Sequence, residues 1–323
     1  MIVVFGSINL DLNFAVERIP APGETMLCPD IRIEPGGKGA NQAVAAARDG
    51  AQVIMTGAVG RDALAAGALR LLREAAIDLS RTVETDASTG CAAITVNPGG
   101  ANAIAVGSGA NRLVCAGQIE DAVLTPSTTL LLQMEVPASE TAALIRRAHG
   151  RDARIVLNLA PALPLPDDAL RMVDLLVTNE TEAAWLARHY GCSADAAAMR
   201  MTLGIDVVRT LGADGIDAAT AAGSVRLPAH KIVPVDTTAA GDCFVGVLAA
   251  ALDRGEPISV ALHRANAAAA LCCTRAGSQG SLPTAEETDA FMGGGRSLTS
   301  PAVGNTAPHP ARRGARVAKG DGL

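Results

Sequence analysis

Residues 129–159, TLLLQMEVPASETAALIRRAHGRDARIVLNL, contain the pattern that decides the fold. The apolar run at 129–135 is typical of a buried strand, and 138–148 is expected to form a helix. A second apolar run at 154–159 completes a strand–helix–strand unit. Units of this kind predict a parallel sheet whose two faces are covered by helices.

The same alternation continues on both sides of this unit. Further strands are expected at residues 1–5, 52–56, 174–178, 206–211, 215–219 and 224–227, with helices at 41–49, 62–76, 167–172, 180–190, 241–253 and 258–273. Crossovers between parallel strands are right-handed, so the expected fold is α/β: a doubly wound, mainly parallel sheet sandwiched by helices.

Two strand-rich stretches, at about 9–34 and 88–108, interrupt the alternation. The second contains a predicted hairpin around Pro98-Gly99-Gly100. We expect a small β-sheet lid over the carboxyl edge of the main sheet, where such folds place ligands. Residues 1–292 are therefore expected to form one domain. Residues 293–323 are rich in Gly, Pro, Ser and basic side chains, and we predict a disordered tail there.

Composition excludes several classes of function. The 323 residues are 49 % hydrophobic and carry a net charge of −6, which argues against binding to duplex nucleic acid. Six aromatic residues are too few for a surface that stacks bases. No apolar run is long enough to span a membrane, and no secretory signal is evident. The seven cysteines form no CxxC pair, so we expect reduced thiols in a cytoplasmic protein without membrane or nucleic-acid partners.

The segment Asp236-Thr237-Thr238-Ala239-Ala240-Gly241-Asp242 precedes an apolar helix. Small residues at a helix start let backbone N–H groups approach an anion, and the helix end adds partial positive charge. Asp242 alone could simply stabilise the helix end. Beside an anion cradle it also suits the base of a phosphoryl transfer, which must accept a proton from the acceptor hydroxyl.

Two segments near the N-terminus could bind a polar ligand. Residues 34–42, EPGGKGANQ, match neither a Walker A loop nor GxGxxG, and the glycines could form an ordinary turn or expose backbone to a ligand. Asn9, Asp11 and Asn13 share one face of a strand. That face could be solvated, or its carboxylate and amides could bind several sugar hydroxyls.

Three further segments are open to two interpretations each. Glu135 closes the strand at 129–135 and could be a site residue at the sheet edge or a loop residue. Residues 178–182, TNETE, could cap the following helix or line a site. Residues 210–215, TLGADG, by themselves indicate only a tight loop.

Taken together and in order, these segments resemble the signatures of the ribokinase-like carbohydrate kinase family, of phosphofructokinase-B type. The resemblance runs from residue 2 to about 292. It is carried by Gly6-Ser7-Ile8-Asn9-Leu10-Asp11, Pro22-Gly23-Glu24-Thr25, Gly36-Gly37-Lys38-Gly39-Ala40-Asn41-Gln42-Ala43, Asn179-Glu180-Thr181-Glu182-Ala183 and Asp236-Thr237-Thr238-Ala239-Ala240-Gly241-Asp242. It implies an enzyme that transfers a phosphoryl group from ATP to a sugar hydroxyl.

The resemblance also implies roles for individual residues. Asp242 would be the base, and the anion hole would be formed by the amides of Ala239, Ala240 and Gly241. The sugar would be held by Asn9, Asp11, Gly37, Lys38, Asn41, Glu135 and Asp242. ATP would be bound by Asn179, Thr210, Gly212, Gly215, Gly241 and Asn266. Glu182 would act on Mg²⁺ through water. A monovalent cation, usually K⁺, would lie among Asp236, Thr238, Cys272, Arg275, Gly277 and Ser281. The family also implies a homodimer formed through the lids.

The expected acceptor is the 5-hydroxyl of D-ribose. Residues 83–112 contain no aromatic side chain to stack a base, which disfavours a nucleoside. Lys38 is the only basic residue among the sugar ligands, which disfavours a phosphosugar. Deoxyribose, fructose, adenosine and uridine remain alternatives. A sugar sensor without catalysis would need no Asp242 beside an anion cradle, and a dinucleotide-dependent oxidoreductase would need GxGxxG after the first strand.

Overall fold

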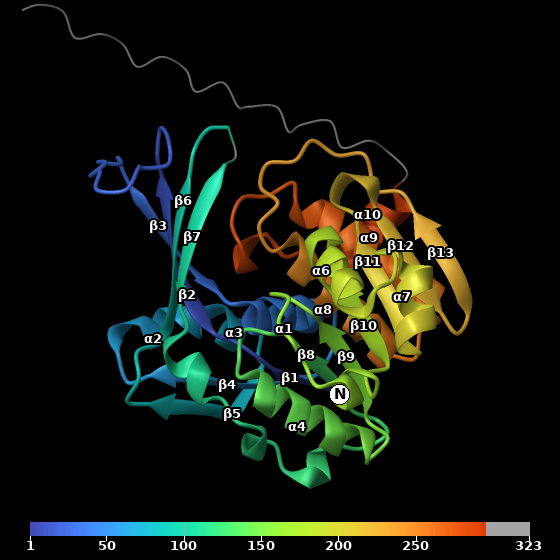
Figure 1. Cartoon of the computed structure of the whole chain (residues 1–323). Helices are drawn as coiled ribbons and strands as arrows, with labels where there is room; N and C mark the ends of the chain where they lie inside the picture. Colours follow the sequence, from blue (N-terminus) through green and yellow to red (C-terminus); the bar gives the residue numbers. More distant parts are fainter. Residues whose placement is uncertain (100, 295–323) are drawn as a thin grey trace, which may run out of the picture.

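The main sheet contains nine strands and confirms the predicted α/β architecture (Figure 1). The computed structural model describes residues 1–99 and 101–294, so the predicted tail from residue 295 onward lies outside the described residues. The strand order is β13 (Gly223–Leu227), β12 (Ile216–Thr220), β11 (Asp206–Thr210), β10 (Leu175–Thr178), β9 (Arg154–Asn158), β8 (Thr129–Leu132), β1 (Ile2–Phe5), β4 (Val53–Gly60) and β5 (Asp78–Thr85). The pairs β11–β12 and β12–β13 are antiparallel, and the other pairs of this sheet are parallel.

Alternate residues of the central strands enter two separate cores. Ile2 and Val4 of β1 pack into one core, and Val3 and Phe5 into the other, because successive side chains of a strand point to opposite faces. The first core is covered by α1 (Lys38–Arg48), α2 (Ala63–Ala68), α3 (Arg70–Glu74), α8 (Ala240–Asp253) and α9 (Ile258–Cys272), with α10 (Ala285–Gly293) against α9. The second is covered by α4 (Ala138–His149), α5 (Asp167–Leu170), α6 (Glu180–Tyr190) and α7 (Ala196–Leu203). Short 3₁₀ helices are η1 (Gly109–Leu113), η2 (Ala116–Gln118), η3 (Asp121–Val123), η4 (Gly212–Asp214) and η5 (Gln279–Ser281).

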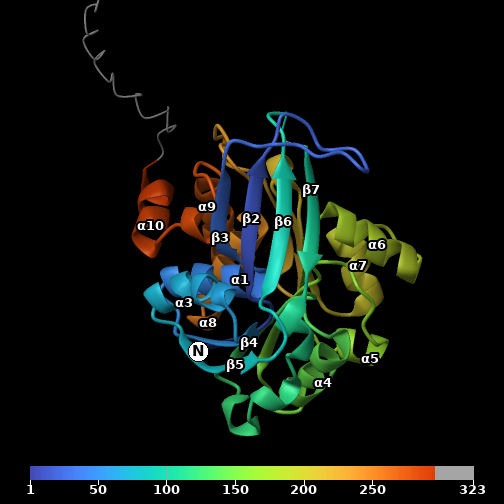
Figure 2. The same ribbon diagram turned by 90° about the vertical axis from the view of Figure 1, so that its left-hand side faces the viewer.

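The predicted lid is a second sheet beside the main one. Its four strands lie in the order β3 (Ile31–Gly36), β2 (Asn9–Ala15), β6 (Gly90–Val96) and β7 (Asn102–Gly107), as Figure 2 shows. The hairpin pairs β6 with β7, while β2 and β6 run parallel, so the lid is a mixed sheet. Cross-strand registers place Asp11, Glu34, Ala92 and Val106 in one row across the lid.

Several predicted boundaries were wrong. The helix expected at 62–76 is two helices, which meet at Leu69. The strand expected at 129–135 ends at Leu132, so Glu135 lies in the loop that leads to Pro137 and α4. The edge strand β5 was missed because its half-exposed residues, DLSRTVET, form no apolar run. Within the described residues, no helix combines the length and apolar character needed to cross a bilayer.

Candidate active site

The start of α8 presents free backbone donors. Ala239 takes the left-handed conformation (φ 58°, ψ 7°) immediately before the helix, which costs about 1–2 kcal/mol in a non-glycine residue. Among the described residues, the amides of Ala239, Gly241 and Asp242 donate to no protein acceptor, and that of Ala240 lies 3.3 Å from the Thr237 carbonyl oxygen. A Cβ added at Gly241 would meet nothing within 4 Å. The predicted anion cradle is therefore open, and its donors converge at the positive end of a helix.

The Asp242 carboxylate is held by two side-chain amides from α1. Its Oδ2 accepts from Asn41 Nδ2 at 2.9 Å, and its Oδ1 accepts from Gln42 Nε2 at 2.9 Å. Asp242 is 8 % exposed. The carboxylate thus lies in a fixed orientation beside the cradle, as a base for an acceptor hydroxyl requires.

Two buried acceptors near Asp242 lack donors. Asp11 Oδ1 and Asn41 Oδ1 have no hydrogen-bond partner among the described residues. Buried polar atoms are nearly always paired, and both of these atoms can accept a hydrogen bond from an O–H group. Asp11 also packs against bare backbone, since a Cβ at Gly36 would lie 2.0 Å from its Oδ2. These acceptors suit a ligand that carries several hydroxyl groups.

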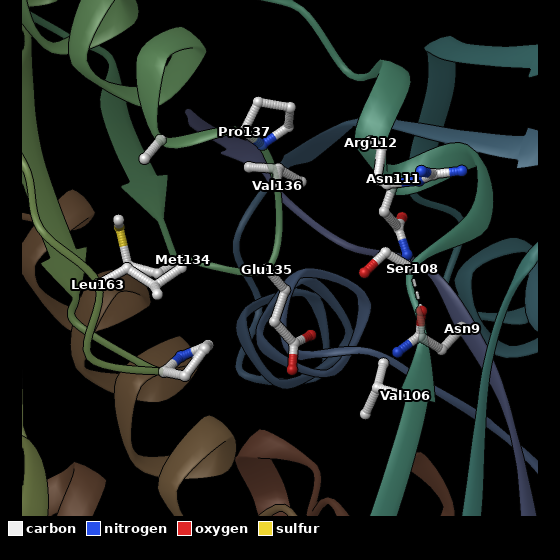
Figure 3. A pocket seen from close by; sticks show the side chains of 12 residues that line it. Asn9, Val106, Ser108, Asn111, Arg112, Met134, Glu135, Val136, Pro137 and Leu163 are labelled. Carbon is white, nitrogen blue, oxygen red and sulfur yellow. Dashed lines mark hydrogen bonds between the residues drawn. The ribbon is translucent and has the colours of Figure 1, made fainter.

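Glu135 and Asn9 line a cavity of about 390 Å³ (Figure 3). Glu135 Oε2 accepts from the Ser7 hydroxyl and from the Lys38 backbone N–H at 3.0 Å. Asn9 Oδ1 accepts from Asn111 Nδ2 at 2.7 Å, so the Asn9 amide nitrogen is left to face the cavity. Glu135 therefore contributes from a loop, and Ser7 and Asn111 are site residues that sequence reasoning missed.

Helix α1 begins tightly against the base of the lid. Gly37 has φ 86°, and a Cβ there would lie 2.9 Å from the Asn9 backbone nitrogen. Only glycine fits this conformation and this approach. Gly37 thereby brings Lys38 and Asn41 beside the strand that carries Asn9 and Asp11, and the predicted sugar ligands converge.

Burial and acidic neighbours give the Asp11 carboxyl an unusually high pKa. Burial raises the pKa of Asp11 to about 7, and the charges of Glu135, Glu34 and Asp242 add to the rise. The unfolded chain releases this proton near the ordinary value of 3.8, so stability falls as the pH rises from about 4 to about 7. Ionised Asp11 offers acceptors on both carboxylate oxygens to the hydroxyls of a ligand.

Asp11→Asn is therefore expected to stabilise the protein and to weaken sugar binding. At pH 8 its melting temperature should exceed that of the native protein by on the order of 5 °C, and the difference should vanish below about pH 4. The KM for the sugar should rise by at least about tenfold. Melting curves and steady-state kinetics measure both effects, with Glu17→Gln on the exposed lid loop as control. A variant that is less stable than the native protein at pH 8 would contradict this account.

Asn111→Ala is expected to raise the KM for the sugar by about tenfold and to change kcat by no more than about threefold. The native side chain accepts from the Ile8 backbone N–H at 2.9 Å and donates to Asn9 Oδ1. Its loss frees the Asn9 amide to rotate away from the cavity. Asn97→Ala in the lid hairpin removes a comparable side-chain acceptor, for the Ala101 N–H, and should leave KM unchanged. Equal KM values for the two variants would show that Asn111 does not orient Asn9.

A second cavity, of about 130 Å³, is lined in part by Asp242 itself. We call it the phosphate cleft; its lining includes Lys38, Thr178, Asn179, Glu182, Thr210, Ala239, Gly241 and Asp242. The Asp242 carboxylate raises the pKa of Lys38, and Glu135, Glu182 and Asp11 add to this rise against the opposing effect of burial. A permanently charged ammonium and the open helix start suit a phosphate chain. Lys38 therefore lines the cleft, while its backbone N–H donates to Glu135 in the first cavity.

The acidic segment after β10 caps its helix and also lines the cleft. Glu182 N donates to Asn179 Oδ1 at 2.9 Å, and Asn179 N donates to Glu182 Oε2 at 2.8 Å. The capping interpretation is confirmed, and Asn179 and Glu182 also line the cleft. Burial raises the pKa of Glu182. The second carboxylate oxygen can act on a Mg²⁺ ion through water, as carboxylates do beside phosphates.

Of the other predicted ATP residues, Thr210 and Gly241 line the cleft, and Gly212, Gly215 and Asn266 do not. Thr210 lines the cleft, and its hydroxyl lies 3.4 Å from the Thr178 carbonyl oxygen. Gly212 is the first residue of η4 and has a φ of 53°. Gly215 directly follows η4 and has a φ of 96°. Asn266 donates its side-chain amide to the Pro228 carbonyl at 2.9 Å and so holds the loop that precedes α8.

The predicted cation residues form a compact loop cluster next to the cradle. Asp236 accepts from the Thr238 hydroxyl at 2.6 Å and from the Gly277 N–H at 3.0 Å. Cys272 Sγ lies 3.1 Å from Ser281 Oγ. The Arg275 side chain instead pairs with Glu287, so only its backbone could serve the cluster.

Asp236 and Thr238 give this cluster side-chain oxygens that could hold a cation. Carboxylate, hydroxyl and backbone oxygens are hard ligands. Within residues 1–99 and 101–294, no group of three or more His, Cys, Asp or Glu side chains could hold a metal ion. A monovalent ion bound through backbone and side-chain oxygens needs no such group.

The site and the fold together define a phosphotransferase that acts on a sugar hydroxyl. The chain belongs to the pfkB family of carbohydrate kinases, which matches residues 1–285. It is 36 % identical over 300 residues to a ribokinase of Staphylococcus aureus (strain COL), covering 89 % of this chain and 98 % of that protein. It is 32 % identical over 300 residues to a deoxyribokinase of Salmonella typhimurium, covering 90 % and 98 %. A solved Arabidopsis thaliana ribokinase, complexed with ribose and ATP, has a TM-score of 0.81 at 28 % identity, covering 90 % of this chain and 98 % of that chain.

Proposed function

We propose that this carbohydrate kinase transfers the γ-phosphoryl group of ATP to the 5-hydroxyl of D-ribose and releases D-ribose 5-phosphate and ADP. The observation that carries the proposal is the pair of buried, unpartnered acceptors, Asp11 Oδ1 and Asn41 Oδ1, next to the fixed Asp242 carboxylate. Ribokinases among the relatives support ribose as the acceptor.

The reaction follows from the order of the groups along the site. Sugar hydroxyls donate to Asp11 and Asn41, and the terminal hydroxyl faces Asp242. Asp242 takes the proton as the hydroxyl oxygen attacks the γ-phosphorus in line with the leaving ADP oxygen. The amides at the start of α8 and the Lys38 ammonium stabilise charge on the transferred group. The lid covers the sugar and excludes water.

Two cations complete the proposal. Glu182 would hold Mg²⁺ through water, and the ion would neutralise charge on the ATP phosphates. Asp236 and the backbone oxygens around it would hold K⁺, whose fixed charge would steady the adjacent cradle. The hydrogen bonds that Asp236 accepts from the Thr238 hydroxyl and the Gly277 N–H support this assignment, since they fix the carboxylate next to the start of α8.

The lid also supports a homodimer. Its face opposite the substrate carries the cross-strand row Leu12, Ile33 and Ala93, and Ile33 is 56 % exposed. A second lid would cover this row. Sedimentation velocity should then give twice the mass of the 32.7 kDa chain. The seven free cysteines support a cytoplasmic location.

Deoxyribose is the second candidate acceptor, because it differs from ribose by one hydroxyl and a deoxyribokinase is among the relatives. Ribose is placed first because the ribokinase of Staphylococcus aureus is more similar to this chain than the deoxyribokinase, at 36 % against 32 % identity. ADP release should be measured with Mg²⁺, with and without K⁺, on ribose, deoxyribose, fructose, fructose 6-phosphate, adenosine and uridine. The proposal predicts the highest kcat/KM on ribose and a loss of rate without K⁺. A higher kcat/KM on any other acceptor would refute ribose as the substrate.

A further inference from the structure

A chain of buried amides runs from the central sheet to Asp242. Gln133 follows β8, and its Nε2 donates to Gln42 Oε1 on α1 at 2.7 Å. Gln42 Nε2 donates to Asp242 Oδ1 and to Asn158 Oδ1, at 2.9 and 3.0 Å. Gln42 and Gln133 are both 0 % exposed. The chain joins four elements that are distant in the sequence, and neither glutamine contacts the cavities described above.

The direction of every hydrogen bond in this chain is fixed by the carboxylate at its end. An ionised carboxylate only accepts, so Gln42 must turn its NH₂ group toward Asp242. Gln42 Oε1 then faces Gln133, which must supply a donor in turn. The reverse arrangement would place an oxygen against Asp242 Oδ1. Gln133 therefore holds the Gln42 amide in the one direction that the Asp242 carboxylate accepts.

Gln133 itself has little freedom to move. A Cβ added at Gly6 would lie 2.0 Å from Gln133 Oε1, so the side chain fills the space left by that glycine. Its Oε1 has no hydrogen-bond partner among the described residues. A core residue that leaves a buried acceptor unpaired carries a stability cost that an apolar side chain would avoid. What Gln133 provides in return for this stability cost is the Nε2 donor to Gln42 Oε1.

We propose that Gln133 is a positioning residue, which orients the catalytic base Asp242 by holding the Gln42 amide. The inference rests on the proposed function, because it takes Asp242 as the base. Gln133 contacts neither sugar nor ATP in this arrangement, so its effect falls on kcat and leaves both KM values unchanged.

Two substitutions test the direction of the chain. Gln133→Met removes the donor and preserves the length of the side chain; kcat should fall by about tenfold, with both KM values within about twofold. Gln133→Glu preserves the shape and, when ionised, replaces the donor by an acceptor. It should then force Gln42 to present its oxygen to Asp242, and kcat should fall by about a hundredfold.

The pH dependence of Gln133→Glu separates positioning from packing. The new carboxyl would face Gln42 in a buried site, with the charges of Asp242, Glu135 and Lys38 nearby, and burial favours its neutral form. The neutral form has an O–H donor that restores the native direction. The kcat of this variant, relative to native, should therefore recover as the pH is lowered. A purely structural defect gives no such recovery.

Thr129→Val serves as the matched control. Thr129 is buried at the opposite end of the same strand, and its hydroxyl donates to Asp253 at 2.9 Å. This variant should lower the melting temperature and leave kcat unchanged. The inference is overturned if Gln133→Met keeps native kcat, or if Gln133→Glu loses activity equally at every pH. If Gln133→Glu does not fold, the tenfold effect of Gln133→Met on kcat alone decides.

Failure of the proposed function gives a different result from failure of this inference. If native protein phosphorylates another acceptor, the same variants are compared on that acceptor, because the amide chain acts on Asp242 and not on the sugar. A ribose-active native enzyme whose Gln133→Met variant keeps native kcat would refute the inference and leave the proposed function standing.

Discussion

Asp242→Asn is expected to lower kcat by about 10²–10⁴-fold, with both KM values changed by no more than about threefold. The substitution removes the group that accepts the proton of the attacking hydroxyl and preserves the size of the side chain. The anion cradle remains, because its donors are backbone amides. Binding of ATP and sugar should therefore survive, and the loss should fall on the chemical step.

The control for this substitution lies in the same helix. Asp253→Asn makes the same chemical change at the other end of α8, where the carboxylate pairs with the N-terminal amine of Met1. It should change the melting temperature and leave kcat unchanged. Initial rates of ADP release over a range of ribose and ATP concentrations measure both variants. An Asp242→Asn enzyme with near-native kcat would remove Asp242 from the role of base.

Lys38→Met is expected to lower kcat by about 10²–10³-fold and to raise the KM for ATP severalfold. Lys38 lines the phosphate cleft beside Asp242, and that carboxylate raises the pKa of its ammonium. The charge is therefore in place when the phosphoryl group crosses from ATP to the sugar. Methionine retains the apolar stem and removes only the charge.

Lys231→Met provides the comparison, since Lys231 is the other lysine in residues 1–99 and 101–294 and lies on an exposed loop. It should be indistinguishable from the native enzyme. An effect of Lys38→Met on the KM for ribose alone would instead assign the side chain to sugar binding. That result would leave the cradle at the start of α8 as the main stabiliser of transferred charge.

The fold was largely predictable because its strands are buried on both faces. Residues such as Ile155, Val156 and Leu157 form an apolar run whose alternate members enter different cores. Such runs are visible in the sequence without any knowledge of their neighbours. The edge strand β5 and the end of β8 were not predictable in this way, since half-exposed residues and a loop that leaves the sheet carry no comparable pattern.

The site was predictable where one short segment carries several of its groups. Asp242 and the cradle lie within four residues, as do Lys38 and Asn41. Asn111 and Gln133 act through hydrogen bonds to residues about 100 positions away, and a lone amide in a sequence has no spacing that points to its partner. Asn179 and Glu182 were easier to predict, since the same short segment both caps α6 and lines the cleft.

The position of the phosphate on the product tests the central claim most directly. The native enzyme, incubated with ATP and ribose and followed by ³¹P–¹H correlation spectroscopy, should give one phosphate ester coupled to the two C5 protons of ribose. Asp242→Asn should form the same ester at an initial rate at least about a hundredfold lower. An ester at C1, or ADP with inorganic phosphate alone, would contradict the account.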